Sequence, residues 1–265
     1  MIPSICIDTL FPELTAQGKI GMLQELGMRS VEFWGWRDKD VEQLAVACRS
    51  AGVTVTNFSA HRRGSPIEPE EHETVLAELA DAQEAAQTLG CQTLMVLSNE
   101  LGEGGRPLQP ERERSDSERR DAMVSLLTEA CRRLYPEMRL VIEPLNTRID
   151  HPGNYLCTMA QAVDIVDRVG DSRLTVLVDF YHLGVMEEDL AGIIRNYSSY
   201  IGYVHLADIP GRGEPGSGTY QWSALFAELM KSGYSGVCGF EYMPQADDAA
   251  SVEACLRFWK SLDAR

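Results

Sequence analysis

The sequence predicts an α/β fold in the form of one TIM-type (β/α)8 barrel, with residues 1–265 as a single domain. Eight short strand-like runs each precede a stretch of helical periodicity, which is the repeat expected of such a barrel. The chain has 265 residues, 44% of them hydrophobic, enough to form the core of one large domain. Nothing along the chain has the composition of an interdomain linker.

The predicted strands are apolar along most of their length, which is typical of a parallel sheet covered on both faces. They lie at residues 5–8, 30–34, 54–59, 93–98, 140–146, 175–180, 200–207 and 236–242. The predicted helices carry apolar residues three and four positions apart, and several end just before a glycine, as at Gly27, Gly52 and Gly90. They lie at residues 16–25, 41–50, 70–89, 118–134, 159–169, 189–197, 223–231 and 249–262.

Two long loops interrupt this repeat, and both are expected on the barrel face that binds ligands. Residues 99–117 include a charged run with Glu111 and Arg112, and this loop is either a lid or a solvated excursion. Residues 210–219 place Arg212 among glycines, which suits close approach to an anionic ligand.

The acidic balance of the chain restricts its partners. A formal net charge of −16 disfavours nucleic acid and anionic membranes, and favours a small molecule. The chain has no apolar run of membrane-spanning length and no secretory leader, so we expect a cytoplasmic protein. Its seven cysteines include no Cys-x-x-Cys pair, in agreement with a reducing compartment. A homo-oligomer is left open.

Four successive predicted strands end on side chains that bind metals: Glu143, Asp179, His205 and Glu241. The carboxyl ends of parallel strands share one edge, and neighbouring strands lie roughly 4.7–4.9 Å apart, so these groups can reach a single ion. Three oxygen donors and one nitrogen suit Mn²⁺, with Mg²⁺ or Co²⁺ as alternatives. The sequence therefore predicts a divalent-metal site.

Two of the four predicted ligands are glutamates placed to exchange protons with a substrate. Glu143 precedes Pro144, which keeps it extended at the strand tip. Strands five and eight are three steps apart, roughly 135° around an eight-stranded barrel, so Glu143 and Glu241 face each other. This arrangement suits an isomerase that moves a proton on a small hydroxycarbonyl compound through an enediolate.

Four motifs follow one another in the second half of the chain. They are Ile-Glu-Pro-Leu-Asn at 142–146, Val-Asp-Phe-Tyr-His at 178–182, Ile-Pro-Gly-Arg-Gly-Glu-Pro at 209–215 and Gly-Phe-Glu-Tyr-Met-Pro at 239–244. Together they resemble the hydroxypyruvate isomerase branch of the xylose isomerase-like TIM-barrel superfamily, which also contains ketose 3-epimerases of the tagatose epimerase type. The resemblance implies that Glu143 and Glu241 are both ligands and acid/base residues, with Asp179 and His205 as the other ligands. It also implies that His182 and Arg212 contact the substrate.

The chain departs from both branches. Hydroxypyruvate isomerases tend to carry glutamine at the positions of His205 and Asp208, whereas histidine at the first is the epimerase-like residue. Ketose 3-epimerases tend to carry a second, substrate-binding glutamate where this chain has Ile149. A hydroxy-keto acid and a sugar therefore both remain as substrates.

Other residues and functions are weaker candidates. His61, after the third strand, and Trp34, on the second strand with Glu32, are candidate substrate contacts, although loop solvation and core packing also account for them. His72 and His151 receive no role. The alternatives are a ketose 3-epimerase, an endonuclease IV-like metal hydrolase and a non-catalytic sugar-binding barrel, but the five histidines and acidic charge disfavour the hydrolase.

Overall fold

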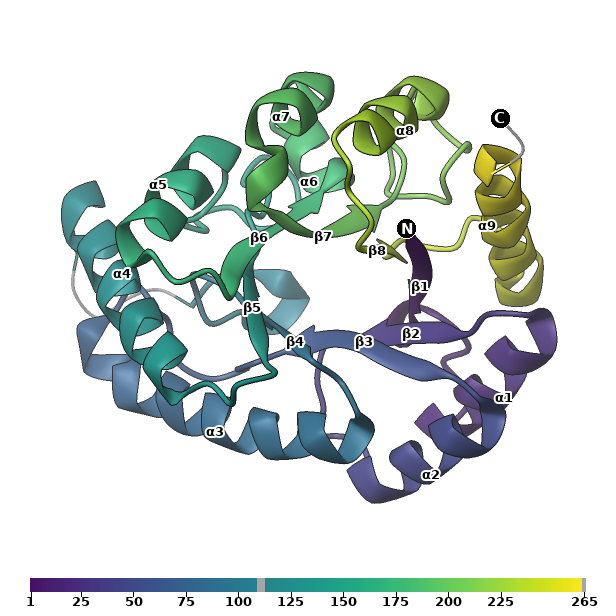
Figure 1. The fold of residues 1–265 in the computed structure, drawn as a ribbon, viewed down its shortest axis with the longest axis horizontal. Coiled ribbons are helices and arrows are strands. Elements are labelled where there is room, and N and C mark those ends of the chain that lie inside the picture. The colour runs from purple at the N-terminus through teal and green to yellow at the C-terminus, as the bar shows by residue number, and fades with distance from the viewer. Residues whose placement is uncertain (109–112, 264–265) are drawn as a thin grey trace.

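The computed structural model describes residues 1–108 and 113–263, and confirms the predicted barrel. Eight parallel strands close in sequence order, with β8 pairing with β1 (Figure 1). The strands are β1 Ile2–Cys6, β2 Ser30–Phe33, β3 Thr54–Ser59, β4 Thr93–Val96, β5 Arg139–Ile142, β6 Leu174–Asp179, β7 Ile201–Leu206 and β8 Val237–Phe240.

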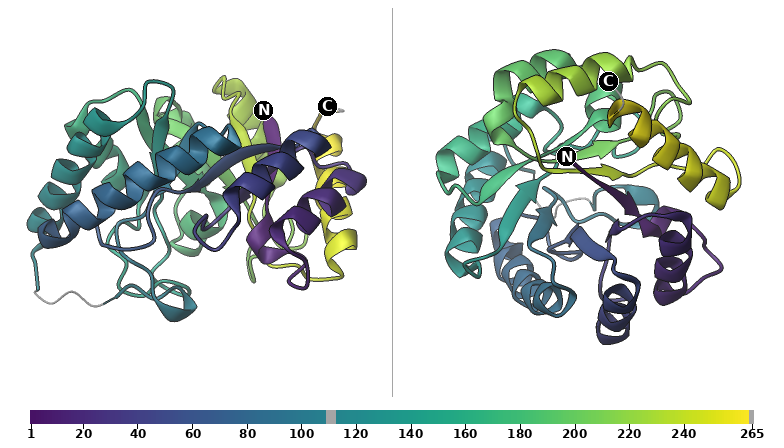
Figure 2. Two further views of the ribbon diagram at one scale, coloured as in Figure 1. Left: turned by 90° about the horizontal axis from the view of Figure 1, so that it is seen from below. Right: turned by 45° about the vertical axis from the view of Figure 1, so that its right-hand side comes forward.

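Helices surround the sheet as a ring (Figure 2). The α-helices are α1 Ala16–Leu26, α2 Val41–Ala51, α3 His72–Leu89, α4 Asp116–Arg133, α5 Met159–Val169, α6 Phe180–Val185, α7 Leu190–Tyr197, α8 Trp222–Lys231 and α9 Asp248–Asp263. Short 3-10 helices are η1 Ile7–Thr9, η2 Pro69–Glu71, η3 Glu103–Gly105 and η4 Ser198–Tyr200. Within the described ranges, no helix has the length and apolar character needed to cross a bilayer.

The strands predicted to end at residues 98, 146 and 242 end earlier, at Val96, Ile142 and Phe240. Two further elements differ more from the sequence-based expectation. The strand predicted at 5–8 starts at Ile2 and ends at Cys6, because Pro3 is tolerated at the start of a strand and Ile2 pairs with Val237. The chain then turns into η1. The second difference is α6, which the apolar run after β6 did not predict. Asp179 begins this helix, because its side chain accepts hydrogen bonds from the amides of Tyr181 and His182.

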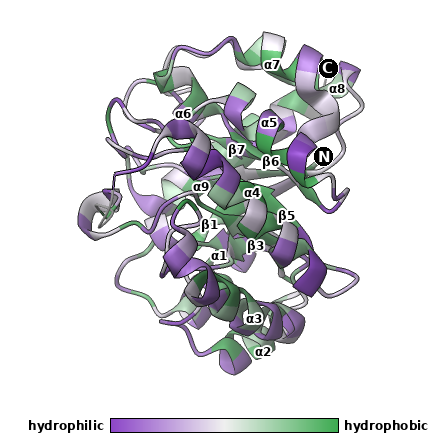
Figure 3. Cartoon of the chain, turned by 90° about the vertical axis from the view of Figure 1, so that its left-hand side faces the viewer, coloured by the Kyte–Doolittle hydropathy of each residue, from purple (hydrophilic) through white to green (hydrophobic). Residues whose placement is uncertain are grey.

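The hydrophobic core has two parts. The larger part fills the space between the sheet and the helices, and Figure 3 shows the strands as more apolar than the outer faces of the helices. The smaller part lies inside the barrel and consists of Met95, Leu97, Val141, Leu145, Leu177 and Tyr203. Polar side chains, including the buried Ser4 and Glu32, share this interior. A barrel filled in this way supports side chains at its upper edge.

Both predicted loops follow the strands expected. The described part of the loop at 99–117 contains η3, while Glu111 and Arg112 lie outside the described residues. The loop after β7 is organised by Asp208, which is fully buried. The carboxylate of Asp208 accepts hydrogen bonds from the amides of Ile209, Gly216 and Tyr220 at 2.9, 2.9 and 3.1 Å, and from the indole of Trp222 at 2.7 Å.

We predict that Asp208→Asn destabilises the protein. The amide would turn an NH2 group toward donors that now meet a carboxylate oxygen, so the expected loss is about 1–3 kcal/mol of unfolding free energy. Guanidinium denaturation measures it. Asp247→Asn is the control, because Asp247 is an exposed capping residue and asparagine caps helices equally well. Equal unfolding midpoints for the two variants would contradict the prediction.

Candidate metal and substrate site

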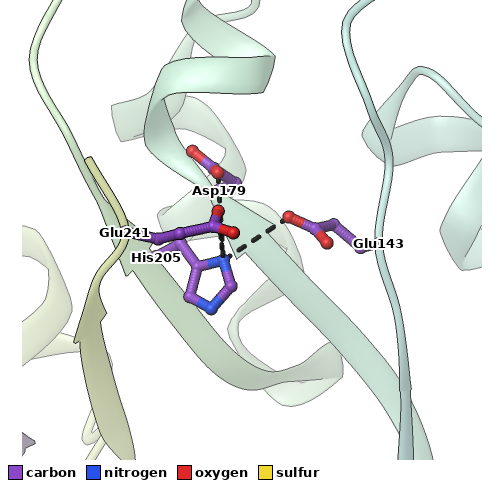
Figure 4. A group of neighbouring side chains, drawn as sticks. All are labelled: Glu143, Asp179, His205 and Glu241. Carbon is purple, nitrogen blue, oxygen red and sulfur yellow. Dashed lines mark ion pairs between the residues drawn. The ribbon is translucent and has the colours of Figure 1, made fainter. Parts of the chain in front are cut away.

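The four side chains predicted as metal ligands lie together at the carboxyl end of the barrel. Glu143 follows β5, Asp179 ends β6, His205 lies in β7 and Glu241 follows β8 (Figure 4). One ligand atom from each lies within 4.8 Å of the others, and all four residues are buried. The structure thus brings together the whole set that the sequence singled out.

His205 lies at the centre of this cluster. Its Nδ1 is 3.3 Å from Glu241 Oε2, 3.5 Å from Glu143 Oε1 and 3.9 Å from Asp179 Oδ2. Glu143 Oε1 and His205 Nδ1 are buried atoms with no hydrogen-bond partner among the described residues. Buried polar atoms without partners are costly, and a bound cation would satisfy them. Three carboxylates and an imidazole are a donor set that fits a divalent ion such as Mn²⁺.

Charge inside the cluster is distributed unequally. Burial raises the pKa of the Glu143 carboxyl to about 7, and it also raises the pKa of Asp179. Burial acts on Glu241 in the same direction, but the charges of Arg212 and His205 hold the pKa of Glu241 well below its usual range. The two facing glutamates therefore differ, with Glu241 ionised and Glu143 able to exchange a proton near neutral pH.

Arg212 reaches the cluster from the loop after β7. Its guanidinium forms ion pairs with Glu241 and, at 3.4 Å, with Asp179. Arg212 has a φ of +56°, and its carbonyl accepts a hydrogen bond of 2.7 Å from the amide of Met243. Trp34, on the opposite side, donates its indole N–H to the second oxygen of Glu241. Two predicted substrate contacts thus hold Glu241 in place.

His182 presents one defined nitrogen to the site. Its Nδ1 lies 2.7 Å from Nδ2 of Asn146 and 3.3 Å from the backbone N of the same residue, so Nδ1 accepts hydrogen bonds. Burial holds the pKa of His182 well below its usual value, which leaves the ring neutral with its proton on Nε2. That atom is 3.7 Å from Asp179 Oδ2.

A cavity of about 470 Å³ adjoins the cluster. Five of the predicted site residues line it: Trp34, Glu143, His182, Arg212 and Glu241. His61 does not line this cavity. Its buried Nε2 lies 3.2 Å from the carbonyl oxygen of Leu97, and burial lowers its pKa to about 4. The structure does not place His61 with the other candidates.

Four further residues belong to the site but received no role from the sequence. Arg62, Asp150 and His151 line the cavity, and Asn146 orients His182. His151 also donates from Nδ1 to the carbonyl of Gly105 at 2.6 Å, which ties the loop after β4 to the site. These contacts join segments that are distant in sequence, so sequence reasoning could not predict them. The one indication in the sequence was that Asn146 and His151 lie in the segment just after β5, on the face that binds ligands.

Comparisons with known proteins agree with this geometry. Residues 20–262 match the family model described as "Xylose isomerase-like TIM barrel". The hydroxypyruvate isomerase of Escherichia coli K12 is 30% identical, and the alignment covers 95% of each chain. This relative supports an isomerase of the same family.

Solved structures share the fold. An AP endonuclease, family 2, from Brucella melitensis superposes with a TM-score of 0.85 at 25% identity, over 97% of this chain and 98% of that one. The D-psicose 3-epimerase of Clostridium cellulolyticum H10, solved with D-tagatose, has a TM-score of 0.83 at 19% identity and covers 99% of both chains. The family model spans most of the sequence, and the chain therefore belongs to the xylose isomerase-like TIM-barrel family.

Proposed function

We propose that this protein is a divalent-metal-dependent isomerase of small hydroxy-keto acids, similar to hydroxypyruvate isomerase. The observation that carries the proposal is the pair of facing glutamates, Glu143 and Glu241, beside a buried donor set at the base of a small cavity. Glu143, Asp179, His205 and Glu241 would hold the ion, preferably Mn²⁺. When bound, such an ion polarises the substrate carbonyl and makes the adjacent C–H more acidic.

The chain's own residues would carry the proton transfer. Glu241, kept ionised by Arg212 and Trp34, is the base that removes the proton next to the carbonyl. Glu143 returns a proton to the neighbouring carbon, and the proton of the substrate hydroxyl passes to the former carbonyl oxygen, so that the carbonyl and hydroxyl groups are interchanged. The Nε2–H of His182 and the guanidinium of Arg212 would donate to the oxygens that gain negative charge in the enediolate. In the reverse direction the two glutamates exchange roles.

The cavity is lined by both carboxylates and arginines, and the arginines suit an anionic substrate. Arg62 and Arg212 both line it, and the carboxylate of a hydroxy-keto acid is matched by a guanidinium. The named activity of the Escherichia coli relative points the same way. A ketose 3-epimerase is the second candidate, supported by His205 and by the shared fold. Against it, Ile149 is 65% exposed and offers no substrate-binding carboxylate.

Glu143→Gln and Glu241→Gln should each lower turnover by at least roughly 10²- to 10⁴-fold, because glutamine keeps the shape of the side chain but cannot accept or donate the transferred proton. Substrate should still bind, and the double variant should lose little more than the single ones. The assay follows hydroxypyruvate isomerisation with Mn²⁺ in deuterated water, where the wild type should incorporate deuterium next to the carbonyl. Product without solvent deuterium would overturn the mechanism.

Mn²⁺ affinity should rise with pH, because the ion competes with protons. In the ion-free site, burial raises the pKa of Glu143 to about 7, and the carboxylates of Glu32 and Glu241 overcome burial to raise that of His205. Calorimetric titration at several values between about pH 6 and pH 8, on both sides of the Glu143 pKa, measures this dependence. His205→Asn should bind more weakly with a shallower slope, and pH-independent affinity in the wild type would contradict the site.

Arg212→Ala should reduce turnover more than Mn²⁺ affinity. Without the guanidinium, the pKa of Glu241 rises, so the acidic limb of the pH–rate profile should move to higher pH. Steady-state kinetics across pH and calorimetric titration with Mn²⁺ give the two quantities. An unshifted acidic limb would argue that Arg212 does not maintain Glu241 as the base.

A further inference from the structure

We infer that Glu32 is a positioning residue for His205, which fixes the ring so that Nδ1 faces the metal. This inference rests on the proposed metal centre and concerns a residue outside the ligand set. Glu32 lies on β2, three strand positions from β7 around the closed barrel, with an exposed fraction of 3%. Its side chain nevertheless reaches the imidazole.

The two nitrogens of His205 face different groups. Figure 4 shows one ring nitrogen directed at the three carboxylates and the other directed away from them. The second nitrogen, Nε2, is 3.2 Å from Glu32 Oε1. Neither of these two buried atoms has a hydrogen-bond partner in the described chain. If Nδ1 gives its lone pair to a cation, the ring proton must be on Nε2, and Glu32 Oε1 is placed to accept it.

The other oxygen of Glu32 is held by a line of hydroxyl groups inside the barrel. Tyr203 donates its phenol to Glu32 Oε2, and the phenol oxygen lies 2.8 Å from Thr56 Oγ1. Thr56 Oγ1 in turn lies 2.7 Å from Ser4 Oγ. Because these hydroxyls come from β7, β3 and β1, the carboxylate is fixed by three strands besides its own. A carboxylate held in this way can define the orientation of the imidazole.

Gly239 on β8 provides the space that this carboxylate occupies. A Cβ at Gly239 would lie 2.3 Å from Glu32 Oε1 and 2.7 Å from Oε2. The backbone of Gly239 lies outside the positive-φ region, so alanine is conformationally acceptable there. Gly239→Ala would therefore displace the end of the Glu32 side chain while leaving its charge in the protein.

The first test is calorimetric titration of the full chain with Mn²⁺ alone. Glu32→Leu should weaken binding by roughly 10- to 100-fold, the range for lost partners of metal-bound histidines. Glu32→Gln should lose less, because its amide oxygen still accepts from Nε2–H. Gly239→Ala should also bind more weakly, and the visible spectrum of its Co²⁺ form should differ from that of the wild type. A purely structural role for Glu32 would leave the spectrum unchanged.

The second test asks whether Glu32 acts through His205. Asparagine at position 205 places an oxygen near the position of Nδ1 but does not reach Glu32. In His205→Asn, adding Glu32→Leu should cause no further loss beyond about twofold, since the pathway is already broken. Glu78→Gln is the matched control, because Glu78 on α3 is a similarly buried carboxylate, which pairs with Arg37 and Arg63 away from the metal cluster. It should leave Mn²⁺ affinity unchanged.

The outcomes separate the two proposals. A wild type that binds no Mn²⁺ would remove the metal centre itself, together with the proposed function. A wild type that binds Mn²⁺ while Glu32→Leu and Gly239→Ala bind equally well would overturn only the role of Glu32. An undiminished effect of Glu32→Leu in His205→Asn would mean that Glu32 acts by charge alone. Circular dichroism establishes folding, and Gly239→Ala carries the test if Glu32→Leu does not fold.

Discussion

The crowding of three buried carboxylates is the constraint on which the upper end of this barrel depends. Glu143, Asp179 and Glu241 place ligand oxygens within 4.8 Å of one another, where mutual repulsion is poorly screened. Positive charge must compensate, and His205 and Arg212 both lie against Glu241. A divalent ion would supply that charge more compactly. Much of the surrounding structure is explained as a means of holding these groups at the required separation.

Sequence patterns predicted the parts of the fold and site that depend on local order along the chain. Apolar runs ending on Glu143, Asp179, His205 and Glu241 identify one edge of a parallel sheet, so their convergence follows once the barrel is assumed. The start of β1 was predicted late, because Pro3 is normally a strand breaker. The short helix α6 was missed, because six residues give too little periodicity to distinguish a helix from a strand.

Contacts between distant segments were beyond sequence reasoning. The two-residue period of an extended strand places Glu32 and Trp34 on the same face, opposite Phe33, but only closure of the sheet shows that one approaches His205 and the other Glu241. The imidazole of His182 is oriented by Asn146, 36 residues earlier. Asp208 differs from the glutamine typical of hydroxypyruvate isomerases, and its carboxylate organises the loop that carries Arg212. The aspartate that replaces this glutamine thus has a structural role in the loop after β7.

Asp179 links occupancy of the cluster to the start of α6. Its Oδ1 accepts from the amides of Tyr181 and His182, at 2.7 and 3.2 Å, while its Oδ2 faces His205 and Arg212. A rigid carboxylate cannot rotate toward an ion without disturbing those two amides. The hydrogen-exchange rates of the Tyr181 and His182 amides therefore report, from the backbone, on how firmly the neighbouring oxygen is engaged. The start of α6, the helix that carries His182, is therefore coupled through Asp179 to the charge of the metal cluster.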